Sequence, residues 1–244
     1  MRIQILRQAD YTVSAWAGGV TTQLAIWPPQ AQYAARSFDW RVSSAVVGAE
    51  ESVFTRLPDY ARHLAILDGQ LRLRHNGGGE LTLHPFTPHV FDGADETRSC
   101  GTCTDFNLML RKGVCCGRIR PIRTGAGQAA CLQAGAEDCW EEQTAVIYCV
   151  RGGVTLTADG RQLRLSQTDC AVLRFCGCVQ LRVSGEYPGV CMLAEFVRLV
   201  EHGDLAGEKM TQEFLHSCKN ELKNAKEAVT ISSMGGDHDA AGTY

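Results

Sequence analysis

Two segments of the sequence carry polar side chains at alternate positions, as strands that line a binding site would. In Trp-Arg-Val-Ser-Ser the alternation places Arg41 and Ser43 on one face, and in Asp-Phe-Asn-Leu-Met it places Asp105, Asn107 and Met109 on one face. If both faces point into a barrel, Arg41 can hold a carboxylate in bidentate fashion while Asp105 and Asn107 bind an amide or amine. Alternatively, these faces are solvated and the opposite apolar faces form the core. The residues by themselves favour the solvated face.

The histidines do not have the spacing of a metal centre. Metal sites in β-barrels commonly use a His-x-His pair and a carboxylate on one strand and another histidine on a later strand. The sequence contains seven histidines and no His-x-His. Only His84 and His89 are close together in a strand-rich region, and the two prolines between them favour an extended loop. We therefore expect neither a metal ion nor another cofactor.

The segment Cys100-Gly101-Thr102-Cys103 has the spacing of a redox pair or of half a zinc site. A structural zinc needs four ligands, and the nearest further pair, Cys115-Cys116, has the wrong spacing. A redox motif would open a helix, whereas the next segment predicts a strand. Two buried or half-buried thiols are the simpler interpretation, with a zinc or redox sensor as the alternative. No nucleophile motif or phosphate loop occurs, so we predict no catalytic residue.

The elements that would position these residues are short strands. Segments rich in β-branched and aromatic residues alternate with glycine, proline, asparagine and aspartate, which is typical of strands joined by turns. They are residues 21–27, 39–47, 63–67, 70–74, 80–83, 106–111, 145–150, 154–157, 162–165 and 179–183. Many short strands at close spacing predict an all-β sandwich or barrel.

An internal repeat in the sequence indicates two copies of the same barrel. Displaced by 83 residues, 64–73 aligns with 147–156, and 80–83 aligns with 162–165 one residue out of step. Each copy predicts strand, glycine turn, strand, turn, strand, which resembles the core of the cupin barrel. A chance likeness between two hairpins is the alternative.

The pattern predicts three parts. We expect an N-terminal barrel over residues 1–113 and a C-terminal barrel over 114–200, joined near 113–130 where glycines interrupt the strands. Residues 201–244 are charged and poor in aromatics, which predicts a helical or disordered tail.

Composition narrows the class of protein. Hydrophobic residues make up 45% and charged residues 21% of the chain, as in folded globular proteins. A net charge of -3 offers no cationic field for nucleic acid. No apolar run of about 18 residues is present and the N-terminus has a charge where a signal peptide is apolar, so we expect a cytoplasmic protein without membrane contact. At this length, in a reducing compartment, most of the twelve cysteines are expected to pack as small apolar residues.

Four segments in series resemble the HutD/Ves family. They are 16–24 with Trp-Ala-Gly-Gly-Val-Thr-Thr-Gln-Leu, 38–45 with its Trp-Arg-Val-Ser strand, Phe-Asp-Gly at 91–93, and 104–111 with Asp-Phe-Asn-Leu-Met. Their order and spacing fit the family, and the resemblance covers roughly residues 1–200. One departure is that only Ala17 separates Trp16 from the glycine pair, where members often carry a longer insert with a basic residue and asparagine.

The resemblance implies two tandem cupin-like barrels of the RmlC-like jelly-roll type without the usual metal ligands. It implies that the protein binds a small polar or acidic metabolite, such as formylglutamate or a related intermediate of histidine degradation, in a regulatory role. The alternative is a metal-independent isomerase or hydrolase acting on a small acid, with Asp105 or a histidine as general base. A homodimer is left open. The ligand-binding residues that the resemblance implies are Trp16, Thr21, Arg41, Ser43, Arg62, Asp105 and Asn107.

Overall fold

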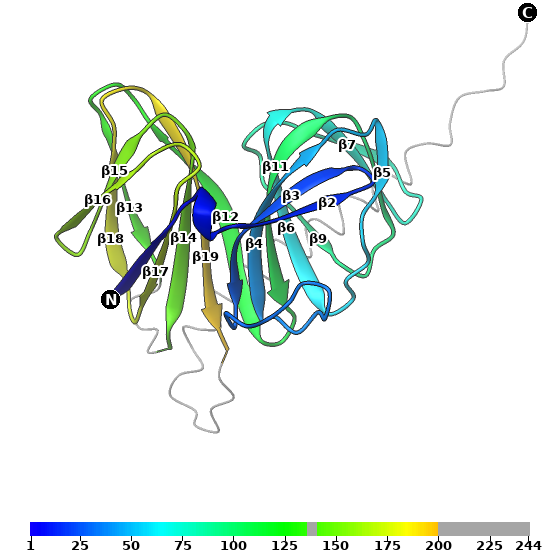
Figure 1. The fold of residues 1–244 in the computed structure, drawn as a ribbon, viewed down its shortest axis with the longest axis horizontal. Helices are drawn as coiled ribbons and strands as arrows, with labels where there is room; N and C mark the ends of the chain where they lie inside the picture. Colours follow the sequence, from blue (N-terminus) through cyan, green and yellow to red (C-terminus); the bar gives the residue numbers. More distant parts are fainter. Residues whose placement is uncertain (136–140, 200–244) are drawn as a thin grey trace, which may run out of the picture.

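The computed structural model describes residues 1–135 and 141–199, and in this part the protein is all-β (Figure 1). One 3-10 turn, η1 (Gln8–Asp10), is the single helical element among these residues. The strands of the first half are β2 (Thr12–Trp16), β3 (Gly19–Trp27), β4 (Trp40–Val47), β5 (Glu51–Val53), β6 (Tyr60–Gly69), β7 (Leu71–His75), β8 (Glu80–Leu83), β9 (His89–Asp92), β10 (Thr97–Cys100) and β11 (Cys103–Arg111). The others are β1 (Arg2–Leu6), β12 (Cys115–Thr124), β13 (Ala129–Ala134), β14 (Gln143–Arg151), β15 (Val154–Ala158), β16 (Arg161–Leu165), β17 (Cys170–Phe175), β18 (Val179–Ser184) and β19 (Gly189–Arg198).

Each half of the chain is a cupin-like barrel made of two sheets. In the first half, a six-stranded sheet in the order β2-β3-β4-β11-β6-β9 faces a four-stranded sheet in the order β5-β10-β7-β8. In the second half, the orders are β1-β17-β14-β19-β12 and β13-β18-β15-β16. Figure 1 shows the two barrels as neighbouring lobes. No helix of the described residues is long and apolar enough to span a membrane.

The second barrel repeats the first strand by strand. The order β4-β11-β6-β9 corresponds to β12-β19-β14-β17, and β5-β10-β7-β8 corresponds to β13-β18-β15-β16. The hairpin β6–β7, which carries the first copy of the sequence repeat, therefore occupies the place of β14–β15. At the turn of this hairpin Gly69 has φ +80°, and a Cβ there would lie 2.4 Å from the Thr102 carbonyl oxygen. Only glycine fits this position without strain.

The larger sheets of the two barrels pack against each other through their apolar faces. Trp40 and Val42 of β4, with Phe106 of β11, meet Tyr148 of β14 and Phe196 of β19 in one buried cluster. The rings of Trp40 and Phe196 lie 4.8 Å apart, centroid to centroid. Because side chains alternate along a strand, this packing turns the polar positions of β4 and β11 toward the inside of the first barrel.

The first strand of the chain pairs with the second barrel. β1 forms an antiparallel ladder with β17, from Arg2 opposite Arg174 to Leu6 opposite Cys170. The chain then enters the first barrel at β2 and returns to the second at β12, after the turn that follows Arg111. The expected division at residue 113 stays a prediction.

Each of the ten segments that the sequence predicts as strands corresponds to a strand, with Asp39 and Gln70 one residue outside β4 and β7. The region 113–130, expected as an interruption between the barrels, instead contains the long strand β12. The expected tail over 201–244 lies outside the described residues.

The expectation that cysteines pack as small apolar residues holds for five buried thiols, those of Cys103, Cys115, Cys149, Cys170 and Cys191. It is wrong for Cys131 and Cys176, whose side chains are exposed.

Candidate functional site

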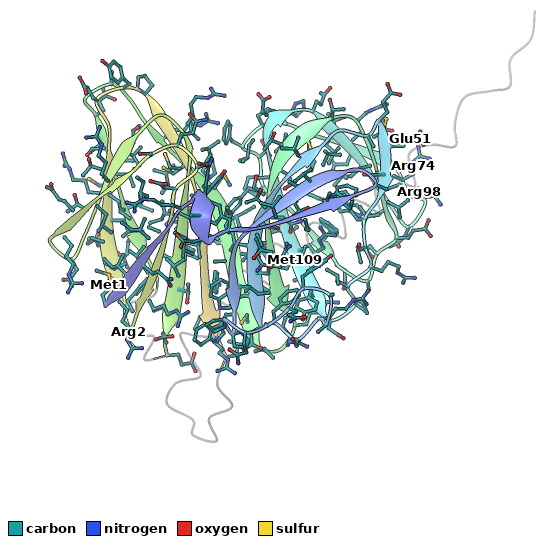
Figure 2. All side chains as sticks on the ribbon, in the orientation of Figure 1. Met1, Arg2, Glu51, Arg74, Arg98 and Met109 are labelled. Carbon is teal, nitrogen blue, oxygen red and sulfur yellow. The ribbon has the colours of Figure 1, made fainter. Side chains whose placement is uncertain are left out.

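The inside of the first barrel contains a cavity of about 340 Å³. The structure brings all seven sequence-predicted residues to its wall: Trp16, Thr21, Arg41, Ser43, Arg62, Asp105 and Asn107. Tyr33, Phe54 and Met109 are among the further lining residues, and Met109 is labelled in Figure 2. Arg41, Asp105 and Asn107 each retain only 4% of their accessible surface. The interpretation of these faces as solvated is therefore wrong.

Three neighbouring strands place the polar residues in rows across the sheet. Met109 of β11 lies directly opposite Arg41 of β4 on one side and Arg62 of β6 on the other. In the next row, Asn107 lies opposite Ser43 on β4. Asp105 follows one row further along β11 on the same face. The strands thus present two guanidinium groups, an amide, a hydroxyl and a carboxylate to one cavity.

Arg41 is held by its neighbours in a fixed orientation. Its Nε donates a hydrogen bond to Gln23 Oε1 at 2.9 Å, and its Nη1 donates to Ser43 Oγ at 3.0 Å. The guanidinium carbon lies 4.5 Å from the centre of the Tyr33 ring. Burial lowers the pKa of Arg41, while Tyr33 and Asp105 oppose that effect. These two bonds leave further guanidinium donors of Arg41, on the wall of the cavity, for a ligand.

Arg62 is buried and lacks a hydrogen-bond acceptor. It is 6% exposed, and it donates no hydrogen bond to any residue that the structure describes, including from its buried Nε. Its guanidinium carbon lies 4.8 Å from the Phe54 ring centre and 5.1 Å from that of Phe91. Burial lowers its pKa to about 10, so the side chain stays a cation at neutral pH. The rings stabilise the cation, but they do not satisfy its N–H donors.

Asp105 is a buried carboxyl group with an unusual proton affinity. Its Oδ1 accepts a hydrogen bond from the Ala45 backbone N–H at 2.8 Å. Burial raises its pKa to about 6, although that hydrogen bond and the positive charges of Arg62 and Arg41 act in the opposite direction. No ion pair joins Asp105 to either arginine among the described residues, so the guanidinium groups are not neutralised by it directly.

Asn107 adds a second unsatisfied group. Its Oδ1 is buried and has no hydrogen-bond partner among the described residues. Buried amide oxygens in folded proteins are normally paired with a donor, since an unpaired one costs free energy. A ligand that carries an N–H group beside a carboxylate would satisfy Asn107 and Arg62 together.

Trp16 and Thr21 lie at the mouth of the cavity on the β2–β3 hairpin. The indole Nε1 of Trp16 donates a hydrogen bond to Thr21 Oγ1 at 3.1 Å. The indole ring covers Gly18, where a Cβ would come within 2.0 Å of a ring atom. Glycine at this position therefore allows the tryptophan, which remains 39% exposed, to fold over the hairpin.

Three residues of the site were missed by the sequence analysis. Gln23, which orients Arg41, could have been found because it shares a strand face with Thr21 by the period of two. Tyr33 lies outside any strand and Phe54 follows the short strand β5, so neither carries a periodic signal.

The second barrel lacks this arrangement at the corresponding positions. Through the repeat, Arg118 of β12 corresponds to Arg41, Glu195 to Met109 and Ala145 to Arg62. Glu195 is buried and accepts a hydrogen bond from Arg118 Nε at 2.6 Å, so its charge is already paired. An apolar cluster that includes Ile147 fills the rest of this interior.

The other motifs singled out in the sequence have structural surroundings of their own. Cys100 is half-buried and Cys103 is buried, as expected, and burial raises the pKa of Cys103 to about 12. Such a thiol is a poor nucleophile, which argues against the redox alternative. His84 is exposed, whereas His89 Nε2 lies 3.0 Å from His75 Nε2. The described residues hold no group of three or more His, Cys, Asp or Glu side chains suited to a metal ion.

Comparisons with known proteins agree with this fold. The model of the family described as HutD matches residues 8–191. PA5104 from Pseudomonas aeruginosa PAO1, described as a conserved protein of unknown function, is similar with a TM-score of 0.69 and 24% identity, over 82% of this chain and 100% of that one. HutD from Pseudomonas fluorescens SBW25, in a formate condition, gives 0.64 and 23% over the same shares. YhhW from Escherichia coli gives 0.57 and 11%, again over 82% and 100%. No curated protein matches the chain significantly.

Proposed function

This chain belongs to the HutD family, and on that premise we propose that the cavity of its first barrel binds a small acidic metabolite through arginine side chains and not through a metal ion. The donors of the cavity wall support the proposal. Guanidinium, amide and hydroxyl groups recognise carboxylates and amides, whereas divalent ions need carboxylates, imidazoles or thiolates in number.

The observation that carries the proposal is the buried guanidinium of Arg62, whose Nε has no hydrogen-bond partner among the described residues. A buried ion without a partner typically costs several kcal/mol, so a folded protein that keeps one gains little stability from it. A carboxylate in the cavity would supply the missing acceptors. An anion in the cavity would complete the interactions of this group, which supports the proposal.

The second arginine narrows the class of ligand. Arg41 and Arg62 stand on either side of Met109, which suits a molecule with two acidic groups or one acidic and one amide group. Asn107 Oδ1 can accept a hydrogen bond from an N–H of that molecule. Formylglutamate has two carboxylates and one N–H, so we propose it, or a related intermediate of histidine degradation, as the ligand. Its binding would serve a regulatory role in the cytoplasm.

Thermal unfolding with candidate acids tests the proposal. Formylglutamate, glutamate, urocanate and formate are added in turn at millimolar concentration, and the melting temperature is measured. A ligand at 100 times its Kd stabilises the folded state by about 2.7 kcal/mol, which is easily detected. We expect formylglutamate to raise the melting temperature and Arg41→Ala to abolish the increase. No increase with any of the acids would contradict the proposal.

A second candidate function rests on Asp105. Its pKa of about 6 is suitable for a general base at neutral pH, and it lies in the same cavity as the arginines. The alternative is therefore a metal-independent isomerase or hydrolase acting on the bound acid. Turnover of an acid by chelator-treated protein, lost in Asp105→Asn while binding is retained, would favour this function over binding alone.

The oligomeric state of the protein can also be tested. We propose a homodimer as the form to test first, by light scattering with and without the acid.

A further inference from the structure

The strand β2 is an exposed edge of the six-stranded sheet of the first barrel (Figure 1). Among the described strands it pairs only with β3. All five of its residues are exposed, which is true of no other strand in the described part of the chain. Its sequence, Thr-Val-Ser-Ala-Trp, contains no charge and no proline, whereas sheets commonly protect an edge with such residues. β2 therefore presents an unprotected row of backbone donors and acceptors.

Exposed apolar side chains gather beside this edge. The described part of the chain has seven exposed large hydrophobic residues, and four of them lie on β2, β3 or β4: Val13, Trp16, Val20 and Val46. Val20 lies directly opposite Ala15 of β2 and directly opposite Val46 of β4. These three residues form an apolar row on the sheet face opposite to the Trp16 side chain. Such a cluster, unlike scattered single residues, indicates a contact surface.

The turn of the β2–β3 hairpin decides which backbone groups face the free edge. The turn has two residues, 17 and 18, and Trp16 pairs with Gly19 beside it. The pair that closes a two-residue turn is hydrogen-bonded, and such pairs alternate with non-hydrogen-bonded pairs along an antiparallel ladder. Every second residue of β2, counted back from Trp16, therefore bonds to β3. The two residues between them, Val13 and Ala15, direct their N–H and C=O groups toward the free edge.

This arrangement makes β2 complementary to itself. When two copies of β2 run antiparallel with Ser14 against Ser14, Val13 of each copy faces Ala15 of the other. Each of these two pairs exchanges two hydrogen bonds, so all the edge-facing groups are satisfied. On the outer face, Val13 of one copy extends the apolar row of Ala15, Val20 and Val46 of the other. Such self-complementarity is what a two-fold interface requires.

We propose that a second copy of this chain docks on β2 in this register, so that the six-stranded sheets of the two copies join into one continuous sheet. The occupant is a second copy because the edge is uncharged and matches itself in hydrogen bonding and in apolar contact. A charged peptide would find no opposite charge on β2. The interface rests on the homodimer of the proposed function, and it places Ser14, on the wall of each acid-binding cavity, at the two-fold axis.

Disulfide trapping tests the register. Ser14 faces its own copy in a non-hydrogen-bonded pair, whose Cα atoms lie about 4.5 Å apart, within the span of a disulfide. The full chain with Ser14→Cys is incubated with oxidised glutathione, which takes up the two electrons that the thiols lose. We expect its covalent dimer to form at least about tenfold faster than that of Leu81→Cys, because paired thiols react as if intramolecular. Leu81 is an exposed residue of β8, an edge strand of the other sheet.

Sedimentation equilibrium of the full chain measures the Kd of the dimer. We expect the wild type to reach twice the 26.6 kDa of one chain. Val13→Lys places an ammonium group on the docking edge of each copy and should raise the dimer Kd by at least about tenfold. Because Val13 is 62% exposed, the variant should keep the melting temperature of the wild type. The matched control, Leu81→Lys, should leave the dimer Kd unchanged.

An unchanged dimer Kd in Val13→Lys would overturn this interface even where a homodimer forms, as would equal trapping of Ser14→Cys and Leu81→Cys. A wild type that stays monomeric at every concentration would also overturn it. The response to acid is a separate measurement. A monomer whose melting temperature rises with formylglutamate overturns the pairing and leaves the acid site standing. A dimer without that rise supports the pairing and contradicts the acid site.

Discussion

Arg41 and Arg62 lie on the two strands that flank β11, and each is directly opposite Met109. Two strand spacings place their Cα atoms about 10 Å apart, and both residues line the same cavity. Burial lowers the pKa of both side chains, and the charge of Arg41 lowers that of Arg62 further. The described part of the first barrel therefore contains two cations that repel each other and one buried carboxyl group, Asp105, that forms no ion pair with either of them. An anion between them would relieve this repulsion.

The first prediction concerns the cost of keeping Arg62 buried. Replacing it with methionine, which has a similar volume, removes an unpaired charge and keeps the contacts with Phe54 and Phe91. We expect Arg62→Met to raise the free energy of unfolding of the ligand-free protein by about 1–4 kcal/mol. The same variant should lose the increase in melting temperature that the acid produces. Chemical denaturation and thermal unfolding measure the two effects.

Arg74→Met is the control for this prediction. Arg74 lies on the four-stranded sheet β5-β10-β7-β8, with its side chain exposed on the outer face, where it is labelled in Figure 2. Its replacement should change the free energy of unfolding by less than about 0.5 kcal/mol and leave the acid response intact. If Arg62→Met instead destabilises the ligand-free protein strongly, the guanidinium has a structural partner and the argument for an anion fails.

The second prediction is that binding of the acid becomes tighter below pH 6. Asp105 has a folded pKa of about 6, raised above its ordinary value of 3.8. As the pH falls from 7 to 5, the carboxylate takes up a proton and the cavity becomes more positive. Each further unit by which a bound anion raises this pKa corresponds to about tenfold tighter binding at the lower pH.

The raised pKa of Asp105 also makes the free energy of unfolding depend on pH. Between about pH 4 and 6 the folded state binds more protons at Asp105 than the unfolded state does, so its contribution falls as the pH rises through that window. From pH 5 to 7 the loss is about 1 kcal/mol. Asp105→Asn keeps an acceptor for the Ala45 N–H and should remove both pH dependences. Calorimetric titration of the acid at pH 5, 6 and 7 checks the binding effect, and an unchanged pH profile in the variant would contradict it.

Much of the fold could be predicted because its signals are local. The ten expected strands alternate or carry β-branched residues between turn formers, and the repeat at 64–73 and 147–156 marks equivalent hairpins. Strands such as β1, β17 and β19 were missed. β17 (Cys170–Phe175) and the middle of β19 are almost continuously buried, so they lack the alternation that identifies a strand with one solvated face.

The site was harder to predict because it depends on which face of a strand is covered. Period-two alternation grouped Arg41 with Ser43 and Asp105 with Asn107, but it could not show that the opposite face packs on the second barrel. That packing, through Trp40 and its partners, makes the polar face the inner one.

The third prediction is that His89 makes the protein sensitive to acid. Burial and the neighbouring His75 lower the pKa of His89 to about 4, below its ordinary value of 6.5. Between these values the unfolded state binds more protons at this residue, so stability falls as the pH decreases through that window. From pH 7 to 5 the loss is about 2 kcal/mol.

His89→Phe keeps the stacked ring beside Phe91 and removes the titrating group. The decrease in the free energy of unfolding between pH 7 and 5 should shrink by about 2 kcal/mol relative to the wild type. His84→Gln, which changes an exposed histidine five residues earlier, should leave the decrease unchanged. Urea unfolding at the two pH values gives both numbers, and equal decreases in all three proteins would show that His89 is not the sensitive group.

The last prediction separates the two barrels. β1 covers the edge of β17, and the side chains of Ile3 and Ile5 pack on the apolar cluster of the second barrel. Deleting residues 1–7 should lower the free energy of unfolding by roughly 3 kcal/mol, since the partly buried side chains of Met1, Ile3, Ile5 and Leu6 are lost. It also uncovers a strand edge that favours aggregation. Hydrogen exchange should accelerate first in β17 and then in β14, which pairs with it. The first residue of the acid site along the chain is Ser14, so the increase in melting temperature with the acid should persist in the deletion variant.

Loss of that increase in the deletion variant would mean that the two barrels fold as one cooperative unit. The apolar interface between the barrels would then couple the acid site to β1, a strand that does not touch it.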